Sequence, residues 1–555
     1  MFRVMQNCVI EWSYQSEKAY EDPFNKVTLC AMVKDAEGIV KRIPGFWSGD
    51  SVWKIRFSSD KQGLFEFTTI CSDSQNEGLH NKQGKISVTP YNGHNNLYRH
   101  GPIEPSENRR YLQHKDGTPF FWLGDTWWMG LTTRLKWPEG FRLLADDRIK
   151  KGFTVIQIVA GLYPDMDPFD KRGANEAGFP WDNYFNTINP DYFDMMDLKI
   201  SELINTGLVP CIVGCWGFFI DFAGKEVIKK HWDYILARYG AYPVVWCMAG
   251  EAVMPFYNNL EVKNNPEKKK EYIDRVRGEW TDVTRHMKET DPFRRLITIH
   301  PTDYGHKMLD DEKMLDLEML QTGHNNFNSL GGTITMVRDS LDRKPGYPVL
   351  NGEVCYEGIG GSCCHDIQRF IFWGCMMSGA CGHTYGANGI WQLNTKENPY
   401  GISPHGATWG NMPWEEAYQL PGSSHVGIGK RLFEKYRWWE FESHPEWVDE
   451  HSTREKPIAL FAAGIPGKVR FIFIPIFGGF GFRRTTKVKG IEKDATYHAY
   501  YFDPITGNEL DTGIVEADEN GEWLSDRTDG FHDWVLVLES MSSTTNKNQE
   551  GIQNG

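Results

Sequence analysis

The segment Pro243-Val244-Val245-Trp246-Cys247-Met248-Ala249-Gly250-Glu251 follows a turn, remains almost wholly apolar and ends on a carboxylate. The segment Tyr347-Pro348-Val349-Leu350-Asn351-Gly352-Glu353 has the same form. A strand that is buried on both faces is continuously apolar rather than alternating. Both segments are therefore predicted to be buried parallel strands with a glutamate at the C-terminal end. In a (β/α)8 barrel, residues at that end of the strands carry the chemistry.

The same pattern recurs along the middle of the chain, between about residues 109 and 437, where apolar strands alternate with polar helices. Such alternation indicates βα units around a parallel sheet. Residues 193–206 and 272–290 are predicted helices that fit between strands. The other predicted strands are Phe120–Asp125, Thr154–Val159, Val209–Val213, Leu296–His300, Leu317–Gln321 and Gly379–Tyr385. Eight strands over about 300 residues match a barrel with loop insertions.

Short strands and turns without helical periodicity precede and follow this region. Residues 1–103 are predicted to form an N-terminal β-sandwich, residues 104–450 the barrel and residues 451–540 a C-terminal β-sandwich. The polar segment 541–555 cannot bury enough apolar surface to order itself, so it is predicted to be a flexible tail. The predicted fold class is thus α/β, a (β/α)8 TIM barrel flanked by N-terminal and C-terminal β-sandwich domains.

Composition restricts the number of domains and the class of partner. With 555 residues the chain is too long for one ordinary domain. Its net charge is −14 and no block of lysine and arginine interrupts the acidic balance, so we expect no nucleic-acid partner. The 21 tryptophans exceed what core packing alone usually requires, and they also suit the apolar faces of sugars.

Cysteine usage and the N-terminus bear on the compartment. The 11 cysteines include no CxxC pair and no compact ligand set, so they are predicted to be mostly reduced, buried thiols. The N-terminus lacks the apolar core of a secretory signal, and no run of about 18 apolar residues occurs, so we expect no membrane partner. A cytoplasmic location is expected for the chain as given, and a periplasmic one if a signal peptide has been removed.

Glycoside hydrolysis needs one carboxylic acid to protonate the leaving oxygen and a second carboxylate to attack the sugar or to activate water. Glu251 and Glu353 would face each other across the barrel axis, which is compatible with the separation of about 5 to 5.5 Å that retaining enzymes use. The arrangement resembles the large clan of barrel glycosidases, in which the residue after strand four is the acid/base and the one on strand seven the nucleophile. The alternative is that one glutamate is a structural carboxylate at the barrel rim.

Polar and aromatic side chains at other strand ends are predicted to bind substrate. They can bond sugar hydroxyls or set the protonation of the carboxylates, and they are His300, Gln321, His324, Tyr356, His383 and Tyr385. Asp125 can hold two vicinal hydroxyls beside the stacking faces of Trp127 and Trp128, unless it forms an Asx turn followed by core tryptophans. Trp216, Trp391 and Trp409 are weaker candidates for the wall of the site.

The sequence predicts neither a metal nor a cofactor. No HExxH, Walker lysine or GxSxG motif occurs, and the histidines are scattered without ligand spacing. The expected partner is an oligosaccharide or glycoside substrate.

Several segments carry a resemblance to a known family. They are residues 116–128, 151–157, 245–251, 321–324 and 351–357. These segments resemble the apiosidase-like glycoside hydrolases, family 140 and its relatives, of gut Bacteroidota, over roughly residues 109 to 440. The flanking β domains are similar to those that often accompany such barrels.

The resemblance implies a retaining mechanism without a metal, with Glu251 at the acid/base position and Glu353 at the nucleophile position. The chain departs from the family pattern twice. Ala249-Gly250-Glu251 replaces Gly-Gly-Asp, and Asn351 replaces the usual aspartate. Endo-apiosidase specificity toward pectin side chains is therefore left open.

The predicted function is retaining hydrolysis of a plant, algal or host glycan through a covalent glycosyl-enzyme intermediate. The alternative from another class is a non-catalytic carbohydrate-binding barrel, and the two differ in whether Glu251 and Glu353 approach within about 6 Å. Transglycosylation would share the covalent intermediate.

Overall fold

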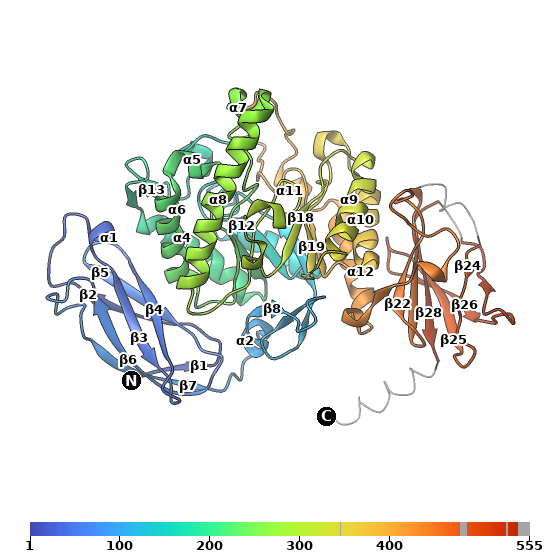
Figure 1. Cartoon of the computed structure of the whole chain (residues 1–555), viewed down its shortest axis with the longest axis horizontal. Helices are drawn as coiled ribbons and strands as arrows, with labels where there is room; N and C mark the ends of the chain where they lie inside the picture. Colours follow the sequence, from blue (N-terminus) through green and yellow to red (C-terminus); the bar gives the residue numbers. More distant parts are fainter. Residues whose placement is uncertain (345, 478–484, 529–530, 542–555) are drawn as a thin grey trace.

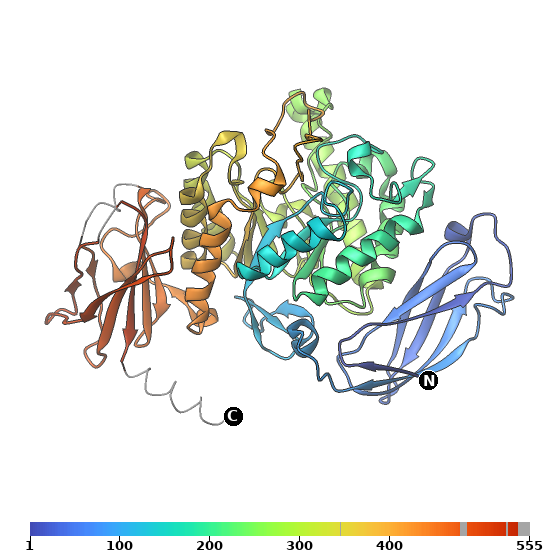
Figure 2. The same ribbon diagram turned by 180° about the vertical axis from the view of Figure 1, so that it is seen from behind.

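The computed structural model describes residues 1–344, 346–477, 485–528 and 531–541. A central barrel lies between two β domains, with the N-terminal domain on the side of helices α4, α6 and α8 and the C-terminal domain against α9, α10 and α12 (Figure 1). The view from behind shows the same row of three parts (Figure 2). The predicted tail, residues 541–555, lies outside the described residues except for Met541.

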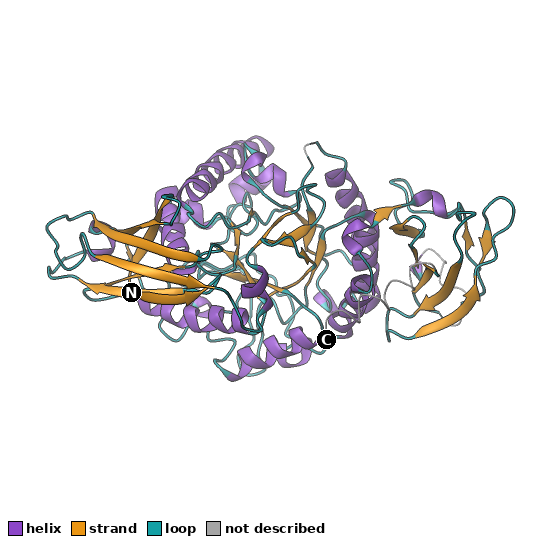
Figure 3. Ribbon diagram, turned by 90° about the horizontal axis from the view of Figure 1, so that it is seen from below, coloured by secondary structure: helices purple, strands orange, loops and turns teal. Residues whose placement is uncertain are grey.

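The barrel prediction is confirmed. The eight parallel strands are β11 Trp122–Thr126, β12 Val155–Val159, β15 Val209–Val213, β16 Val245–Cys247, β17 Ile297–Thr298, β18 Glu318–Gln321, β19 Val349–Glu353 and β20 Gly382–Tyr385. They pair in the order β17-β16-β15-β12-β11-β20-β19-β18. Figure 3 shows the strands as a ring within a ring of helices. Nearly every strand residue is buried, because helices cover the outside and side chains fill the inside.

The barrel closes between β17 and β18 without a regular ladder among the described residues. The Asp316 amide donates to the Ile297 carbonyl at 2.8 Å, and the Ile297 amide donates to the Asp316 side chain at 2.9 Å. The Thr298 hydroxyl adds a bond to the Leu317 carbonyl at 2.9 Å. One aspartate thus replaces part of the strand pairing that the short strand β17 cannot supply.

Helices follow most barrel strands, as the alternation of segments predicts. They are α3 Glu139–Lys150, α4 Pro190–Asn205, α6 Lys225–Tyr239, α8 Pro266–Thr290, α9 Phe327–Leu341, α10 His365–Ser378 and α12 Pro421–Glu434. Helices α4 and α8 contain most of the two predicted helical ranges, and each begins at a proline after a capping asparagine, Asn189 or Asn265. Between β17 and β18 the described residues form only the 3-10 turns η2 Gly305–Met308 and η3 Glu312–Met314.

The loops between these elements, and the segment that follows α12, carry further short elements. They are α5 Phe219–Ala223, α7 Leu260–Asn264, α11 Trp414–Ala417, β13 Trp181–Asp182, β14 Thr187–Ile188, η1 Lys171–Gly173, η4 Ile359–Gly361, η5 Trp438–Glu440 and η6 Pro445–Trp447. Among the helices of the described ranges, none combines the length and apolarity that a membrane crossing requires.

The N-terminal domain is a small β-sandwich, as predicted. Its strands are β1 Phe2–Met5, β2 Ile10–Gln15, β3 Leu29–Lys34, β4 Val40–Trp47, β5 Val52–Phe57, β6 Gly63–Cys71 and β7 Gln83–Thr89, with α1 Pro23–Lys26 between β2 and β3. Strand β4 pairs with β3 through residues 40–44 and with β5 through residues 45–47, so one strand contributes to both layers. Trp12, Ile43, Trp53 and Phe67 form part of a core of their own.

Arg56 of β5 connects this domain to the barrel. Its guanidinium bonds the Asp197 carboxylate of α4 at 3.1 Å and the Arg238 carbonyl of α6 at 2.8 Å. The Arg238 guanidinium reaches the same Asp197 carboxylate at 2.9 Å. Helix α2 Asn96–His100 and the small sheet of β8 Ile103–Pro105, β9 Leu112–His114 and β10 Pro119–Phe120 complete the connection.

The C-terminal domain has a six-stranded sheet and a two-stranded sheet. The strands are β21 Glu442–Ser443, β22 Phe461–Ile465, β23 Val469–Ile474, β25 Tyr497–Phe502, β26 Glu509–Ile514 and β28 Trp534–Ser540, with β24 Lys487–Val488 and β27 Trp523–Leu524 in the smaller sheet. Phe461, Phe471 and Phe473 of the larger sheet belong to the same apolar cluster as the barrel. Arg369 of α10 pairs with Asp533 at 2.6 Å, with both side chains buried.

Most cysteines are free thiols, as predicted, but Cys355 and Cys363 form a disulfide. All of the free cysteines except Cys8 and Cys364 are buried. The disulfide was not predicted, because it joins residues at the two ends of a short loop whose path is not evident from the spacing of the cysteines.

Candidate active site

A cavity with about 480 Å³ of free space opens at the C-terminal ends of the barrel strands. Nine of the predicted site residues line it, namely Trp128, Trp216, Glu251, Gln321, His324, Glu353, Tyr356, Trp391 and Trp409. The cavity therefore contains both predicted carboxylates and four of the predicted tryptophans.

Glu353 is the last residue of β19 and receives contacts on both carboxylate oxygens. Gln321 Nε2 donates to Oε1 at 2.9 Å, and His324 Nε2 lies 2.9 Å from the same oxygen. The Tyr356 hydroxyl donates to Oε2 at 2.7 Å, and His300 Nε2 lies 3.0 Å from it. Groups of this kind stabilise the ionised form of a carboxylate.

Glu251 lies beyond the end of β16 with a left-handed backbone, at φ 44°. Strained conformations of this kind persist where the surrounding structure fixes them, which is common at functional sites. The Trp216 indole donates to Glu251 Oε2 at 3.1 Å. A Cβ atom on Gly250 would come within 2.2 Å of the same indole ring, so glycine is required for Trp216 to reach Glu251.

Gln321 connects the two carboxylates. Its Nε2 atom lies 3.1 Å from Glu251 Oε1 and 2.9 Å from Glu353 Oε1. Two oxygens at these distances from one nitrogen cannot be more than about 6 Å apart. The carboxylates are thus close enough to act on the same anomeric carbon.

The electrostatic environment differs between the two glutamates. Burial raises the pKa of Glu251 above its ordinary value, and the negative charge of Glu353 raises it further. Burial also acts to raise the pKa of Glu353, but the charge of His300 and the hydrogen bonds from His300 and His324 outweigh it and hold the pKa well below its ordinary value. Two carboxyl groups with pKa values moved in opposite directions are suited to separate acid and base roles.

Tyr356 and His300 both contact the Oε2 atom of Glu353. The Trp128 indole donates to the Tyr356 hydroxyl at 2.8 Å, which in turn donates to Glu353. His300 is fully buried and does not line the cavity, so it contacts the carboxylate instead of binding substrate directly. The charge of Glu353 raises the pKa of His300 against the effect of burial.

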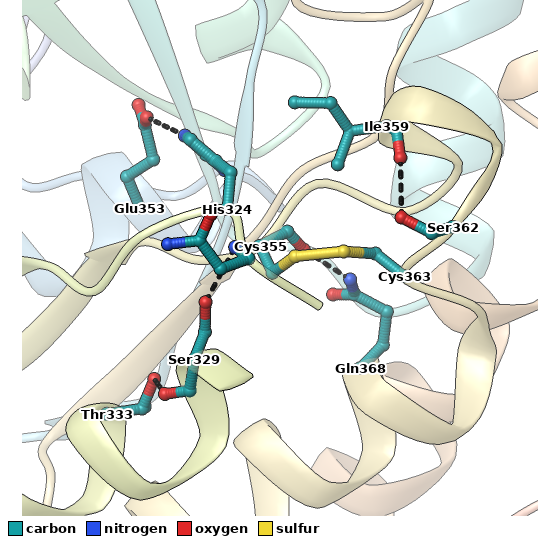
Figure 4. Close-up of a disulfide and its surroundings, with 10 residues drawn as sticks. His324, Ser329, Thr333, Glu353, Cys355, Ile359, Ser362, Cys363 and Gln368 are labelled. Atoms are coloured by element: carbon teal, nitrogen blue, oxygen red, sulfur yellow. Dashed lines mark hydrogen bonds and ion pairs between the residues drawn. A yellow bond between two sulfur atoms is a disulfide. The ribbon is translucent and has the colours of Figure 1, made fainter. Parts of the chain in front are cut away.

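The Cys355–Cys363 disulfide closes the loop that carries Tyr356 and Ile359, both of which line the cavity. Figure 4 shows the bond beside His324 and Glu353, with the Gln368 side chain donating to the Cys355 carbonyl. The loop that follows Glu353 is therefore covalently fixed close to the carboxylate.

The structure corrects the predictions for Asp125 and Trp127. Asp125 is fully buried, pairs with Arg148 Nε at 2.6 Å and accepts hydrogen bonds from the Thr126 amide and the Trp127 indole. Trp127 packs against Phe141 of α3. This is the structural alternative of an aspartate turn followed by a core tryptophan.

His383 and Tyr385 are also corrected, because they point from β20 toward the helices. The His383 ring packs against Phe372 of α10, and the Tyr385 hydroxyl donates to Glu357 at 2.6 Å. Burial lowers the pKa of His383 to about 3. Side chains alternate along a strand, and the intervening Thr384 bonds Gln157 across the barrel interior at 3.1 Å.

Several residues that line the cavity were not predicted from the sequence. Asp165, in the loop after β12, is the most notable, and Pro164, Tyr257 and Ile359 also contribute. Asp165 could have been predicted from its position in the loop after a barrel strand, because such loops form the active face. Among the described residues, no group of three or more His, Cys, Asp or Glu side chains is placed to hold a metal ion.

Residues 106–440 match the sequence profile of a known catalytic domain, described as "Apiosidase-like, catalytic domain". The chain belongs to the apiosidase-like family of glycoside hydrolases. In this apiosidase-like chain, residues 3–72 match a second profile, a domain of unknown function named DUF5060. No curated relative matches the chain.

Solved structures share the fold of the apiosidase-like chain. A putative glycoside hydrolase from Bacteroides vulgatus ATCC 8482 has a TM-score of 0.68 at 17% identity, covering 98% of this chain and all of its own. A family 5 glycoside hydrolase from the same organism has a TM-score of 0.65 at 20% identity, over 80% of this chain and 95% of its own. A protein named glycoside hydrolase gives 0.65 at 22% identity, over 80% of this chain and 98% of its own.

Proposed function

We propose that the chain hydrolyses glycosidic bonds with retention of the anomeric configuration, with Glu353 as nucleophile and Glu251 as acid/base. The observation that carries this proposal is the contact of one Gln321 nitrogen with both carboxylates. Retaining enzymes separate the two carboxyl groups by about 5 to 5.5 Å, whereas inverting enzymes leave about 6.5 to 9.5 Å for a water molecule. The upper limit of about 6 Å between the two Oε1 atoms favours retention.

In the first step, a carboxylate oxygen of Glu353 attacks the anomeric carbon while the glycosidic bond breaks. The leaving oxygen takes the proton of Glu251, whose pKa is raised by burial. The products of this step are a glycosyl ester on Glu353 and a free alcohol. The four groups around Glu353 keep it ionised before attack.

In the second step, Glu251 has become a carboxylate and removes a proton from a water molecule. The water oxygen bonds to the anomeric carbon, and the ester bond to Glu353 breaks. Both glutamates return to their starting protonation states, and the sugar leaves with its original anomeric configuration.

The proposed substrate is an oligosaccharide or glycoside from a plant, algal or host glycan. The aromatic residues Trp128, Trp216, Tyr356 and Trp391 line the cavity and offer apolar faces to a sugar ring. The membership in the apiosidase-like family supports a carbohydrate substrate.

The test compares Glu353→Gln and Glu251→Gln on aryl glycosides. Glu353→Gln is expected to abolish turnover on every substrate, because no nucleophile remains. Glu251→Gln is expected to retain turnover of glycosides with a good leaving group such as 2,4-dinitrophenolate, which needs little protonation. The anomer formed first, followed by proton NMR, is expected to match the substrate. An inverted product, or equal losses in both variants on both kinds of leaving group, would refute the assignment.

Glu289→Gln serves as a control, since Glu289 is exposed on α8 and outside the cavity. It is expected to leave turnover unchanged. If the wild-type chain binds oligosaccharides but hydrolyses none of them, the alternative of a carbohydrate-binding barrel replaces the proposed function.

A further inference from the structure

Asp165 is a third carboxylate of the cavity, and the proposed reaction does not use it. It lies in the loop after β12 with a left-handed backbone, at φ 59°, and only 2% of its surface is exposed. Its backbone amide donates to the Tyr257 hydroxyl at 3.1 Å. The surrounding structure thus holds an acidic side chain in an unfavourable backbone conformation at the wall of the cavity.

The two carboxylate oxygens of Asp165 differ in their contacts. Oδ2 accepts hydrogen bonds from the Ser403 hydroxyl and from the Trp409 indole, the latter at 3.2 Å. Oδ1 is buried and has no hydrogen-bond partner among the described residues. The His405 ring nitrogen Nε2 lies 3.7 Å from Oδ1, beyond hydrogen-bond distance. One oxygen of this residue of the cavity lining is therefore anchored, and the other has no donor among the described residues.

A buried acceptor without a donor is unfavourable, so such an atom in a cavity points to a ligand that supplies one. Burial raises the pKa of Asp165 above its ordinary value, although Ser403, His405 and Trp409 act in the opposite direction. Sugar hydroxyls are donors of the kind required. Because a hydroxyl bonded to a carboxylate forms a charge-assisted hydrogen bond, the interaction is stronger than one between neutral groups.

The remainder of the cavity wall indicates which sugars fit. Trp391 and Trp409 meet nearly at right angles, at 80° and 6.3 Å, and the Trp391 ring is stacked with Tyr356 at 18°. No lysine or arginine lines the cavity among the described residues, whereas Asp165, Glu251 and Glu353 all do. A carboxylate or sulfate on the bound sugar would meet these acidic groups with no lysine or arginine of the described lining to compensate for it.

Resting on the proposed function, we propose that Asp165 is a specificity-determining residue whose Oδ1 atom accepts a hydrogen bond from a hydroxyl of an uncharged sugar in this cavity. A site built to bond a hydroxyl discriminates strongly against analogues that lack it, because its polar group is then left unpaired. Asp165 thereby selects neutral sugars with a hydroxyl at one position over deoxy sugars and over hexuronic acids.

The test uses Asp165→Asn, because its neighbours fix the orientation of the new amide group. Since Ser403 and Trp409 both donate to the Oδ2 position, the asparagine oxygen must occupy that position and its NH2 group the Oδ1 position. The free acceptor thus becomes a donor with little change in shape. Asp167→Asn is the control, because Asp167 is exposed in the same loop and outside the cavity.

The probes are 4-nitrophenyl glycosides of neutral pentoses and hexoses, of their monodeoxy forms and of hexuronic acids. Wild type is expected to cleave a neutral glycoside at least 100-fold more efficiently than any hexuronide. Asp165→Asn is expected to lower kcat/KM on that glycoside by about 10- to 100-fold, the range for a hydrogen bond to a charged group. Asp167→Asn is expected to remain within about twofold of wild type, as surface substitutions usually do.

The monodeoxy glycosides separate recognition from a structural role. For one monodeoxy glycoside, we expect wild type to show the same reduction in kcat/KM that Asp165→Asn shows on the parent glycoside. On that deoxy glycoside, Asp165→Asn is expected to lower kcat/KM no further. If Asp165→Asn lowers kcat/KM equally on the parent and on every deoxy glycoside, or if wild type prefers hexuronides, the proposal is overturned.

A direct binding measurement distinguishes this proposal from the proposed function. Trp391 and Trp409 line the cavity, so free neutral monosaccharides and glucuronic acid can be titrated against intrinsic fluorescence. If no glycoside is cleaved, the proposed function fails. Binding of a neutral sugar that is weakened in Asp165→Asn still supports the role of Asp165, and binding that is unchanged, or absent from wild type, rejects it.

Discussion

The two glutamates of the cavity are chemically alike, yet their neighbours differ. Glu353 is contacted by Gln321, His300, His324 and Tyr356, whereas Glu251 receives hydrogen bonds from Gln321 and Trp216. Burial acts to raise the pKa of both carboxyl groups, but His300 and His324 outweigh it at Glu353, whereas the charge of His300 does not outweigh it at Glu251. The proposed roles of the two glutamates therefore rest on their contacts and not on their residue type.

The dependence of activity on pH tests this asymmetry. The proposed mechanism needs Glu353 ionised and Glu251 protonated. The lowered pKa of Glu353 places the acid limb of kcat/KM below 4.5, the ordinary glutamate value, and the raised pKa of Glu251 places the alkaline limb above it. We expect Glu251→Gln to lose the alkaline limb on substrates with good leaving groups. Persistence of that limb in the variant would assign it to another group.

Gly250 provides a second test at the scale of single residues. In Gly250→Ala the new methyl group would lie 2.2 Å from the Trp216 ring, so the indole that bonds Glu251 must move. Loss of one hydrogen bond to a charged group costs about 1.5 to 3 kcal/mol, so we expect kcat/KM to fall by about 10- to 100-fold. Gly332→Ala is the comparison, since a Cβ at this exposed position of α9 meets no atom within 4 Å. Equal activities of the two variants would contradict the role of Trp216.

At the scale of elements, the eight barrel strands could be predicted because each is a short apolar run next to a polar helix or loop. The direction of individual side chains could not. His383 and Glu353 both lie near strand ends, but His383 faces Phe372 of α10 while Glu353 faces the cavity. Likewise, the sequence did not show that Asp125 pairs with Arg148 of α3 instead of facing the cavity.

Contacts between loops that are distant in the chain could not be predicted from the sequence either. Asp165 and Ser403 are 238 residues apart in the chain, and no local pattern associates them. The Cys355–Cys363 pair is only 8 residues apart, but a disulfide depends on the path of the loop between the two cysteines. Spacing alone therefore predicted strands and rim carboxylates, whereas the side walls of the cavity required the folded loops.

The disulfide loop leads to a prediction at this scale. Because a bond across 8 residues restricts the unfolded chain, Cys363→Ser is expected to lower the free energy of unfolding by about 2.5 kcal/mol in the chain-entropy description. The freed loop also holds Tyr356, which donates to Glu353, so we expect kcat/KM to fall by about tenfold. Urea denaturation and steady-state kinetics measure the two effects.

Cys364→Ser is the matched control for that experiment. Cys364 is exposed, adjacent in sequence and free of any disulfide, so the variant is expected to resemble wild type in both measurements. If Cys363→Ser behaves in the same way as this control, the disulfide neither stabilises the loop nor positions Tyr356.

At the scale of the whole molecule, Asp197 joins the N-terminal domain to the barrel through Arg56 and Arg238. Burial acts to raise the pKa of Asp197, but the two guanidinium groups outweigh it and lower the pKa. Asp197→Asn leaves both cations without their shared partner, and breaking such a pair costs about 3 to 5 kcal/mol. We expect a loss of unfolding free energy of that order at pH 7.

The sign of the pH effect follows from the lowered pKa. The stabilisation by Asp197 is fully present above the ordinary aspartate value of 3.8 and disappears as the pH falls through the lower value of the folded state. The difference between wild type and Asp197→Asn should therefore shrink in strongly acidic solution. Asp146→Asn, at an exposed position of α3, is expected to change stability by less than about 0.5 kcal/mol. A constant difference from pH 7 to pH 3 would exclude the ion pair as its source.

The apolar cluster shared by the barrel and the larger C-terminal sheet has a consequence for how this protein can be divided or recombined. Cutting the chain after α12 would expose to water the apolar side chains of the barrel that this sheet covers. An engineer who transplants the barrel must therefore transplant the larger C-terminal sheet with it, or replace the apolar residues that the sheet covers.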